Sequence, residues 1–234
     1  MTERPAPEEK VPDDAWQLLA PRFTDERRDK MQAVAGARTA HIRLMVQDIH
    51  DPHNISACMR SAEALGILNF DIINLYQKKV PPSVARGAEN WLRIRYHDSV
   101  ADAVQDLKGR GYRIAAGFPP AGADLSLFDV PVDEPIALLF GNEHRGLDPS
   151  WLPDIDYRFT IPMAGMVESF NVSVSAAMCL LELTRRSRLL LPENKYFLPP
   201  SQREQLLGEW ALRQTKRPLE TLSRLREQQK SAKS

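Results

Sequence analysis

The segment IPMAGMVESFNVSVSAAM, residues 161–178, predicts a turn between a strand and a long helix. The apolar stretch 157–161 ends the strand, and the helix continues through MCLLEL after a turn that contains Gly165. Ligands of α/β proteins bind at such turns, because the first N–H groups of the helix have no partner within it. This segment therefore predicts an α/β fold and the place of a ligand site.

Helix capping is a simpler interpretation of the same turn. Ser169 and Asn171 are of residue types that favour N-caps, and a cap needs no further function. The small and β-branched residues after Asn171 suit close approach of other backbone and favour a functional turn. Both interpretations stay open for these two residues.

Strands alternate with helices over some 150 residues of the chain. The expected strands cover residues 42–49, 70–75, 91–96, 112–116, 136–140 and 157–161. The expected helices cover residues 24–35, 52–65, 82–88 and 99–108, with a short one from Asp148 and Pro149 and a long one after the turn. This alternation predicts a mostly parallel sheet covered by helices on both faces.

We divide the chain into four parts. Residues 1–23 are rich in proline and charge and are expected to be a flexible tail, with at most a short helix at 16–19. Residues 24–40 form an N-terminal helix, and residues 41–190 form the α/β domain. Residues 191–234 form a basic helical extension, in which Leu206, Leu207, Trp210 and Leu212 make a packing stripe.

Composition places the protein among ordinary globular domains, with 43% hydrophobic and 26% charged residues. No apolar run approaches the ~20 residues that span a bilayer. The N-terminus has no apolar signal region, so we expect a cytoplasmic protein with no membrane partner. Cys58 and Cys179 lie in apolar helical patterns and are expected to be buried free thiols.

The formal net charge is zero, but the charges are segregated. Residues 1–26 hold seven acidic and three basic residues, a net charge of −4, whereas residues 201–234 hold four acidic and eight basic residues, a net charge of +4. Such segregation points to nucleic acid, although solvated helix faces explain it equally well.

Several common motifs are absent from the sequence. It has no dinucleotide-binding G-x-G-x-x-G after the first strand, no phosphate-binding G-x-x-x-x-G-K-[ST] and no G-x-S-x-G elbow. His50 and His53 flank Asp51, but spacing supplies no third ligand, so we expect no metal.

Polar side chains instead gather in three loops after expected strands, at residues 51–60, 140–146 and 161–171. Each has a simpler explanation. Asn54 could only cap its helix, Arg60 could only pair with Glu63, and Glu143 could only pair with Arg145. Three such loops at one edge of a sheet favour a shared site.

The segments HNISACMRSAEALG (53–66), LLFGNEHRG (138–146) and IPMAGMVESFNVSVSAA (161–177) strongly resemble the three motifs of the SPOUT-class RNA ribose 2′-O-methyltransferases. Within that class the chain is similar to the bacterial tRNA guanosine-18 ribose methyltransferases, over residues 25–190. The resemblance implies a C-terminal trefoil knot, an obligate homodimer and S-adenosylmethionine as methyl donor. General topology rules argue against a knot.

The resemblance also implies functional positions. Catalytic positions fall on Asn54, Arg60, Glu143, Ser169 and Asn171. Cofactor contacts, largely main-chain, fall on Gly117, Phe118, Gly141, Asn142, Ile161, Met163 and Phe170. The segment from Gly117 reads Gly-Phe-Pro-Pro, where family members often carry a small hydroxyl residue.

In the resulting hypothesis Arg60 stabilises the developing alkoxide, Asn54 orients Arg60, and Glu143 neutralises or positions it. Ser169 and Asn171 shape the turn that holds the donor, and no metal is needed. The basic segments 22–30 and 185–233 are candidate tRNA surfaces.

Two alternatives stay open: methylation of rRNA or another tRNA ribose, and an RNA-binding protein without catalysis. The roughly 40 residues before the first strand are too few for a separate RNA-binding domain, which favours tRNA.

Overall fold

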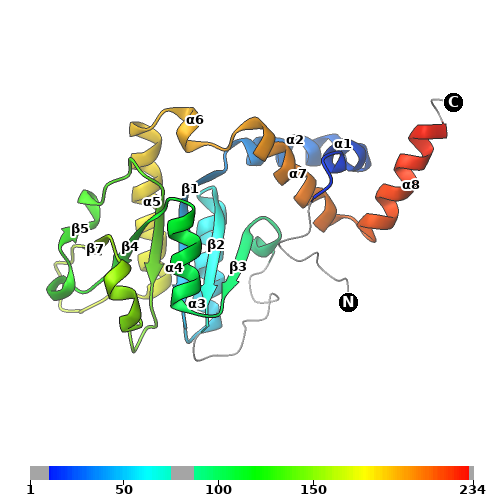
Figure 1. The fold of residues 1–234 in the computed structure, drawn as a ribbon. Coiled ribbons are helices and arrows are strands. Elements are labelled where there is room, and N and C mark those ends of the chain that lie inside the picture. Colours follow the sequence, from blue (N-terminus) through cyan, green and yellow to red (C-terminus); the bar gives the residue numbers. More distant parts are fainter. Residues whose placement is uncertain (1–10, 75–86, 232–234) are drawn as a thin grey trace. The chain divides into compact units, whose positions relative to one another are not determined.

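The computed structural model describes residues 11–74 and 87–231. The chain divides into two compact units, and Figure 1 colours them along the sequence. One unit is Thr39–Tyr196, and the other joins Met1–Arg38 with Phe197–Ser234. The N-terminal helix and the C-terminal extension, which the sequence analysis separates, thus belong to one unit.

Among the described residues, Thr39–Tyr196 carries a seven-stranded sheet in the order β3-β2-β1-β6-β4-β7-β5. Every neighbouring pair is parallel, so the predicted α/β class and parallel sheet are confirmed. The strands are β1 (Thr39–Gln47), β2 (Ile67–Ile73), β3 (Arg93–His97), β4 (Arg113–Gly117), β5 (Leu125–Ser126), β6 (Ile136–Phe140) and β7 (Tyr157–Thr160).

The helices of this unit begin where short polar side chains cap them. Asp51 caps α3 by accepting from the His53 N–H, and Ser99 caps α4 by accepting from the Asp102 N–H. The helical elements are α3 (Pro52–Ala64), η3 (Ala88–Asn90), α4 (Val100–Gly109), η4 (Pro120–Gly122), η5 (Leu127–Asp129), η6 (Pro149–Asp154), α5 (Val172–Leu190) and α6 (Glu193–Tyr196).

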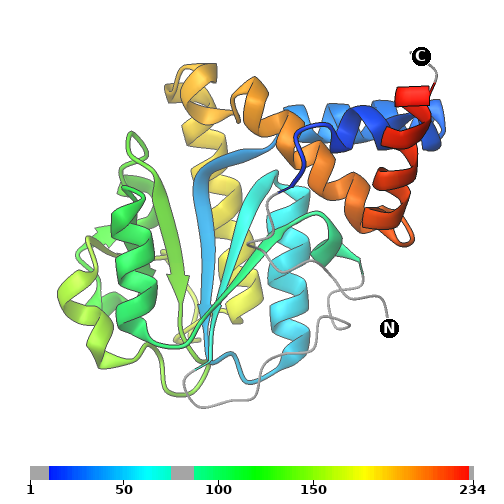
Figure 2. The same cartoon turned by 45° about the vertical axis from the view of Figure 1, so that its right-hand side comes forward.

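Two apolar cores lie on the two faces of the sheet, as its parallel strands require. Ile42, Leu44 and Val46 of β1 belong to the core shared with α3 and α5. Met45, between them, belongs to the core shared with α4 and η6. Figure 2 shows α4 on one side of the sheet and α3 and α5 on the other.

Several predicted boundaries shift. The strand expected at 91–96 begins at Arg93, because η3 and its C-cap Trp91 precede it. The strand expected at 70–75 begins earlier, at Ile67, and the helix expected at 82–88 lies largely outside the described residues. The two-residue strand β5 escaped prediction because it is too short for a periodic pattern.

The second unit contains α1 (Ala15–Leu19), η1 (Ala20–Arg22), α2 (Asp25–Gly36), α7 (Pro200–Gln214) and α8 (Pro218–Ser231). The short helix anticipated at 16–19 exists, but residues 15–22 are no loose tail. Ala15, Trp16, Leu18 and Leu19 are buried, and α1 packs against α7. The predicted α7 stripe, Leu206, Leu207, Trp210 and Leu212, is buried as well. Apolar burial thus outweighs the charged composition around α1.

Both cysteines are buried free thiols, and burial raises the pKa of Cys58 to about 12. Over the ranges 11–74 and 87–231, no helix combines the length and the apolar character that a bilayer crossing requires.

A buried network of charged side chains links β1, β2 and β3 on the face of the sheet that α4 covers. Asp71 of β2 accepts hydrogen bonds from Arg43 Nε at 2.8 Å, Arg43 Nη2 at 3.1 Å and His97 Nε2 at 2.9 Å. Asp106 of α4 pairs with Arg43 and Arg95. Asp71, His97 and Asp106 place ligand-type atoms within 4.8 Å of one another, but arginines already neutralise these carboxylates.

Replacing Asp71 by Asn should destabilise the protein by roughly 3 kcal/mol, because the buried Arg43 charge then loses its fully buried carboxylate partner and keeps Asp106, whose side chain is 17% exposed. Glu134→Gln is the matched control, since Glu134 pairs with Arg113 where both side chains are about half exposed. That change should cost less than about 1 kcal/mol. Denaturant unfolding measures both, and equal losses would contradict the burial argument.

Candidate functional site

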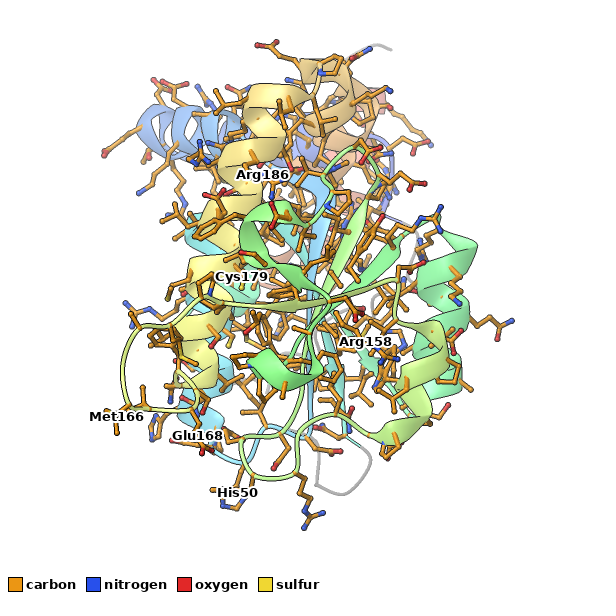
Figure 3. All side chains as sticks on the ribbon, turned by 90° about the vertical axis from the view of Figure 1, so that its left-hand side faces the viewer. His50, Arg158, Met166, Glu168, Cys179 and Arg186 are labelled. Atoms are coloured by element: carbon orange, nitrogen blue, oxygen red, sulfur yellow. The ribbon has the colours of Figure 1, made fainter. Side chains whose placement is uncertain are left out.

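Three loops leave the carboxyl edge of the sheet. The first follows β1 and enters α3, the second, residues 141–148, follows β6, and the third, residues 161–171, follows β7 and enters α5. We call residues 141–148 the middle loop. β1 pairs with β6, and β4 pairs with both β6 and β7, so these loops start close together. Figure 3 shows His50, Met166 and Glu168 at this end of the unit.

The Glu143 carboxylate connects the first loop to the middle loop. Its Oε2 accepts a hydrogen bond from the His50 N–H at 2.9 Å, and its Oε1 accepts one from Asn54 Nδ2 at 2.8 Å. Partial burial raises the pKa of Glu143, but these hydrogen bonds outweigh it, and the pKa lies below its ordinary value. The group is therefore a carboxylate at neutral pH.

Asn54 extends this connection to the third loop. Its Oδ1 accepts a hydrogen bond from Asn171 Nδ2 at 3.1 Å. Asn171 Oδ1 in turn accepts from the Ser173 N–H at 2.8 Å and from Ser173 Oγ at 2.7 Å. Asn171 is thus the N-cap of α5, as the simpler interpretation held, and it also contacts Asn54. Asn54 itself is not a cap, because Asp51 caps α3.

The middle loop is built on close backbone contacts. Asn142 and Gly146 exchange two backbone hydrogen bonds, of 3.0 and 2.9 Å. Gly146 has a φ of 72°, which favours glycine. A Cβ at Gly141 would lie 2.5 Å from the carbonyl carbon and oxygen of Gly146, so no other residue fits there without movement.

Two predicted catalytic residues stand apart from this group. The side chains of Arg60 and Ser169 are exposed and make no hydrogen bond with any residue in the described ranges. Arg60 lies six residues after Asn54, about 9 Å along α3 and about 240° around its axis. Asn54 is engaged by Glu143 and Asn171 and does not orient Arg60 within one chain.

Most positions expected to contact a cofactor lie at the ends of β4, β6 and β7, and Phe170 lies directly before the N-cap of α5. Ile161 and Met163 are half-buried, whereas Ala164 to Phe170 are exposed, and Met166 is fully so. A Cβ at Gly117 would lie 3.0 Å from the Phe140 ring, so β4 also presents bare main chain here. The Phe118 N–H is already used by the Phe159 carbonyl, at 2.8 Å.

Sequence reasoning missed several residues that hold the middle loop. Gln47 and Asp48, at the end of β1, are buried and bond to it, as does the His50 N–H. The φ of Asp48, 49°, has no signature in the sequence. His50 and His144 form an edge-to-face ring pair with centroids 6.0 Å apart.

Comparison with known proteins assigns this architecture. The family model described as "SpoU rRNA Methylase family" matches residues 41–181. The tRNA (guanosine(18)-2′-O)-methyltransferase of Thermus thermophilus is 31% identical over 190 residues, 80% of this chain and 96% of the relative. The enzyme of the same name from Escherichia coli is 32% identical over 176 residues, 74% of this chain and 76% of the relative.

Solved structures agree. The A. aeolicus TrmH/SpoU tRNA modifying enzyme superposes with a TM-score of 0.71 at 25% identity, over 80% of this chain and 95% of that one. The SpoU methyltransferase AviRb from Streptomyces viridochromogenes, in complex with the cofactor AdoMet (S-adenosylmethionine), gives a TM-score of 0.59 at 26% identity, over 66% of this chain and 60% of that one. With its parallel sheet, its three connected loops and these relatives, the chain belongs to the SpoU methylase family.

Proposed function

We propose that this protein transfers a methyl group from S-adenosylmethionine to a ribose 2′-hydroxyl of tRNA, at guanosine 18. The single observation that carries the proposal is the hydrogen-bonded series Glu143–Asn54–Asn171, which joins all three motif loops at one sheet edge. The names of the most similar relatives support guanosine 18 and tRNA. Bound S-adenosylmethionine supplies a methyl group on a sulfonium centre.

Arg60 is the residue that would act on the ribose oxygen. Its guanidinium stays protonated near neutral pH, so it stabilises the negative charge that develops on the oxygen and does not remove the proton. A substrate phosphate or water takes the proton. One such donor contributes roughly 3–4 kcal/mol to transition-state stabilisation. Glu143, as a carboxylate, holds Asn54 and the turn before α5 in place.

A homodimer would complete the site. Val174, Met178 and Leu181 form one stripe of α5 and are 45%, 37% and 58% exposed, while the opposite side of the helix is buried. Apolar stripes on opposite sides of one helix are normally both covered. Since Arg60 lies away from Asn54 on its own helix, we propose that the Arg60 of one copy serves the Asn54 group of the other.

The proposal extends to the chain path and the RNA surface. Strand β6 lies between β1 and β4, yet the chain then crosses β4 to form β7 and returns to α5 beside β1 and α3. Such a return supports the expected trefoil knot. Helix α8 carries three basic and two acidic residues, and its basic residues support tRNA binding by the unit to which it belongs, whereas in α2 and α7 basic and acidic residues are equal in number.

The direct test is methyl transfer to unmodified tRNA transcripts from labelled donor. Label on the ribose of guanosine 18 is expected, and a transcript with 2′-deoxyguanosine at that position should accept none. Label on rRNA fragments would show that the substrate is rRNA, and label at another tRNA ribose would show that a different nucleotide is methylated. Donor binding without any transfer would indicate an RNA-binding protein without catalysis.

Arg60→Ala and Asn54→Ala should each lower the transfer rate by about two orders of magnitude or more, with donor binding retained for Arg60→Ala.

Co-expressing the two variants with different tags then tests whether two copies share one site. If Arg60 and Asn54 come from different copies, each mixed dimer has one intact site and should recover about half of wild-type activity per dimer. Inactive mixed dimers would show that both residues act within one chain.

The ionised Glu143 carboxylate should stabilise the folded protein at neutral pH and lose this effect at acidic pH. Its folded-state pKa lies below the ordinary 4.5, so its contribution is present above pH 4.5 and is lost as pH falls through the folded-state pKa. The difference in unfolding free energy between wild type and Glu143→Gln should therefore shrink on acidification. Denaturant unfolding from pH 7 downward measures it, and a constant difference would exclude the ionised role.

A further inference from the structure

Gln47 ends β1 with a side chain that is only 2% exposed. Its Oε1 accepts hydrogen bonds from the Asp148 N–H at 3.1 Å and from Trp151 Nε1 at 2.9 Å. Trp151 is fully buried in the core shared with α4. One neutral acceptor with two lone pairs thus joins the end of the middle loop and the helix η6 to strand β1.

The next residue holds the other end of the middle loop. The Asp48 carbonyl accepts a hydrogen bond from Asn142 Nδ2 at 2.6 Å. Asp48 is 4% exposed and has a φ of 49°, a strained value for a residue that is not glycine. Asn142 Oδ1 meanwhile accepts from the N–H groups of His144 and Arg145. Gln47, the last residue of β1, and Asp48, which follows it, therefore hold the loop at Asp148 and at Asn142.

Glu143 lies between these two attachments. Residues 143–146 are exposed, so little apolar packing holds them. The carboxylate can accept hydrogen bonds from both the His50 N–H and Asn54 Nδ2 only if the loop keeps its position relative to the edge of the sheet. The same loop carries Gly141, where the Gly146 backbone leaves no room for a Cβ and fixes how bare main chain is presented.

We propose that Gln47 is a positioning residue for donor binding. It touches neither Glu143 nor the proposed ligand contacts, and acts on them through Asp148, Trp151 and the middle loop. This inference rests on the proposed function, because the loop matters only if it contributes to the S-adenosylmethionine site. Gln47 Nε2 lies 3.4 Å from Asp48 Oδ2, so an amide suits this place better than a second buried carboxylate.

Gln47→Met removes both acceptor contacts at similar volume. We expect the dissociation constant for S-adenosylmethionine, measured by calorimetry, to rise about tenfold. The KM for the donor should rise with it, while the KM for tRNA stays unchanged. Trp151→Phe keeps a smaller aromatic ring and removes one of the two donors, so its effect on donor binding should be smaller. The double variant should weaken binding by less than the product of the single effects, because both act through one contact.

A matched control separates a role of Gln47 in donor binding from a general effect on stability. Thr184→Val removes a buried hydroxyl that donates to the Leu180 carbonyl at 2.7 Å, well along α5 from the middle loop. It should lower the melting temperature and leave donor affinity unchanged. Equal weakening by Thr184→Val, or wild-type affinity in Gln47→Met, would overturn the inference. If Gln47→Met fails to fold, wild-type donor affinity in Trp151→Phe overturns it instead.

Failure of the proposed function would look different. If the wild-type protein does not bind S-adenosylmethionine, the proposed function is wrong, whatever the variants do. If the wild type binds and Gln47→Met binds equally well, only the positioning role of Gln47 is wrong.

Discussion

The site depends on one carboxylate. Glu143 accepts from a backbone N–H of the first loop and from the Asn54 amide, which in turn meets the N-cap of α5. Because an ionised carboxylate is an acceptor only, both oxygens must face donors, and this fixes which side of the middle loop faces α3. The position of the turn before α5 follows from that choice, since Asn171 both caps the helix and contacts Asn54.

The sheet makes this arrangement possible because all its strands are parallel. Loops that follow β1, β6 and β7 leave the same edge, although about 90 residues separate His50 from Glu143 in the chain. Buried polar contacts from Gln47 and Asp48, at the end of β1, then fix the position of the middle loop relative to the sheet. Apolar packing alone would leave the exposed middle loop free to adopt other positions.

One chain holds only part of the proposed machinery. The Glu143–Asn54–Asn171 group forms within it, whereas Arg60 lies on another side of α3 and is exposed. The apolar stripe of α5 and the location of Arg60 are both explained if a second copy covers this surface. Association would then complete the site and bury the stripe.

By itself the sequence determined the alternation of strands and helices and the three motif loops, and it offered Asn171 as a helix cap, because these depend on local periodicity and residue chemistry. It did not reveal the burial of α1, the strand β5 or the positive φ of Asp48. It also paired Asn54 with Arg60, whereas the fold engages Asn54 with Glu143 and Asn171. Such contacts join residues far apart in the chain, and only the packing of the sheet brings them within hydrogen-bonding distance.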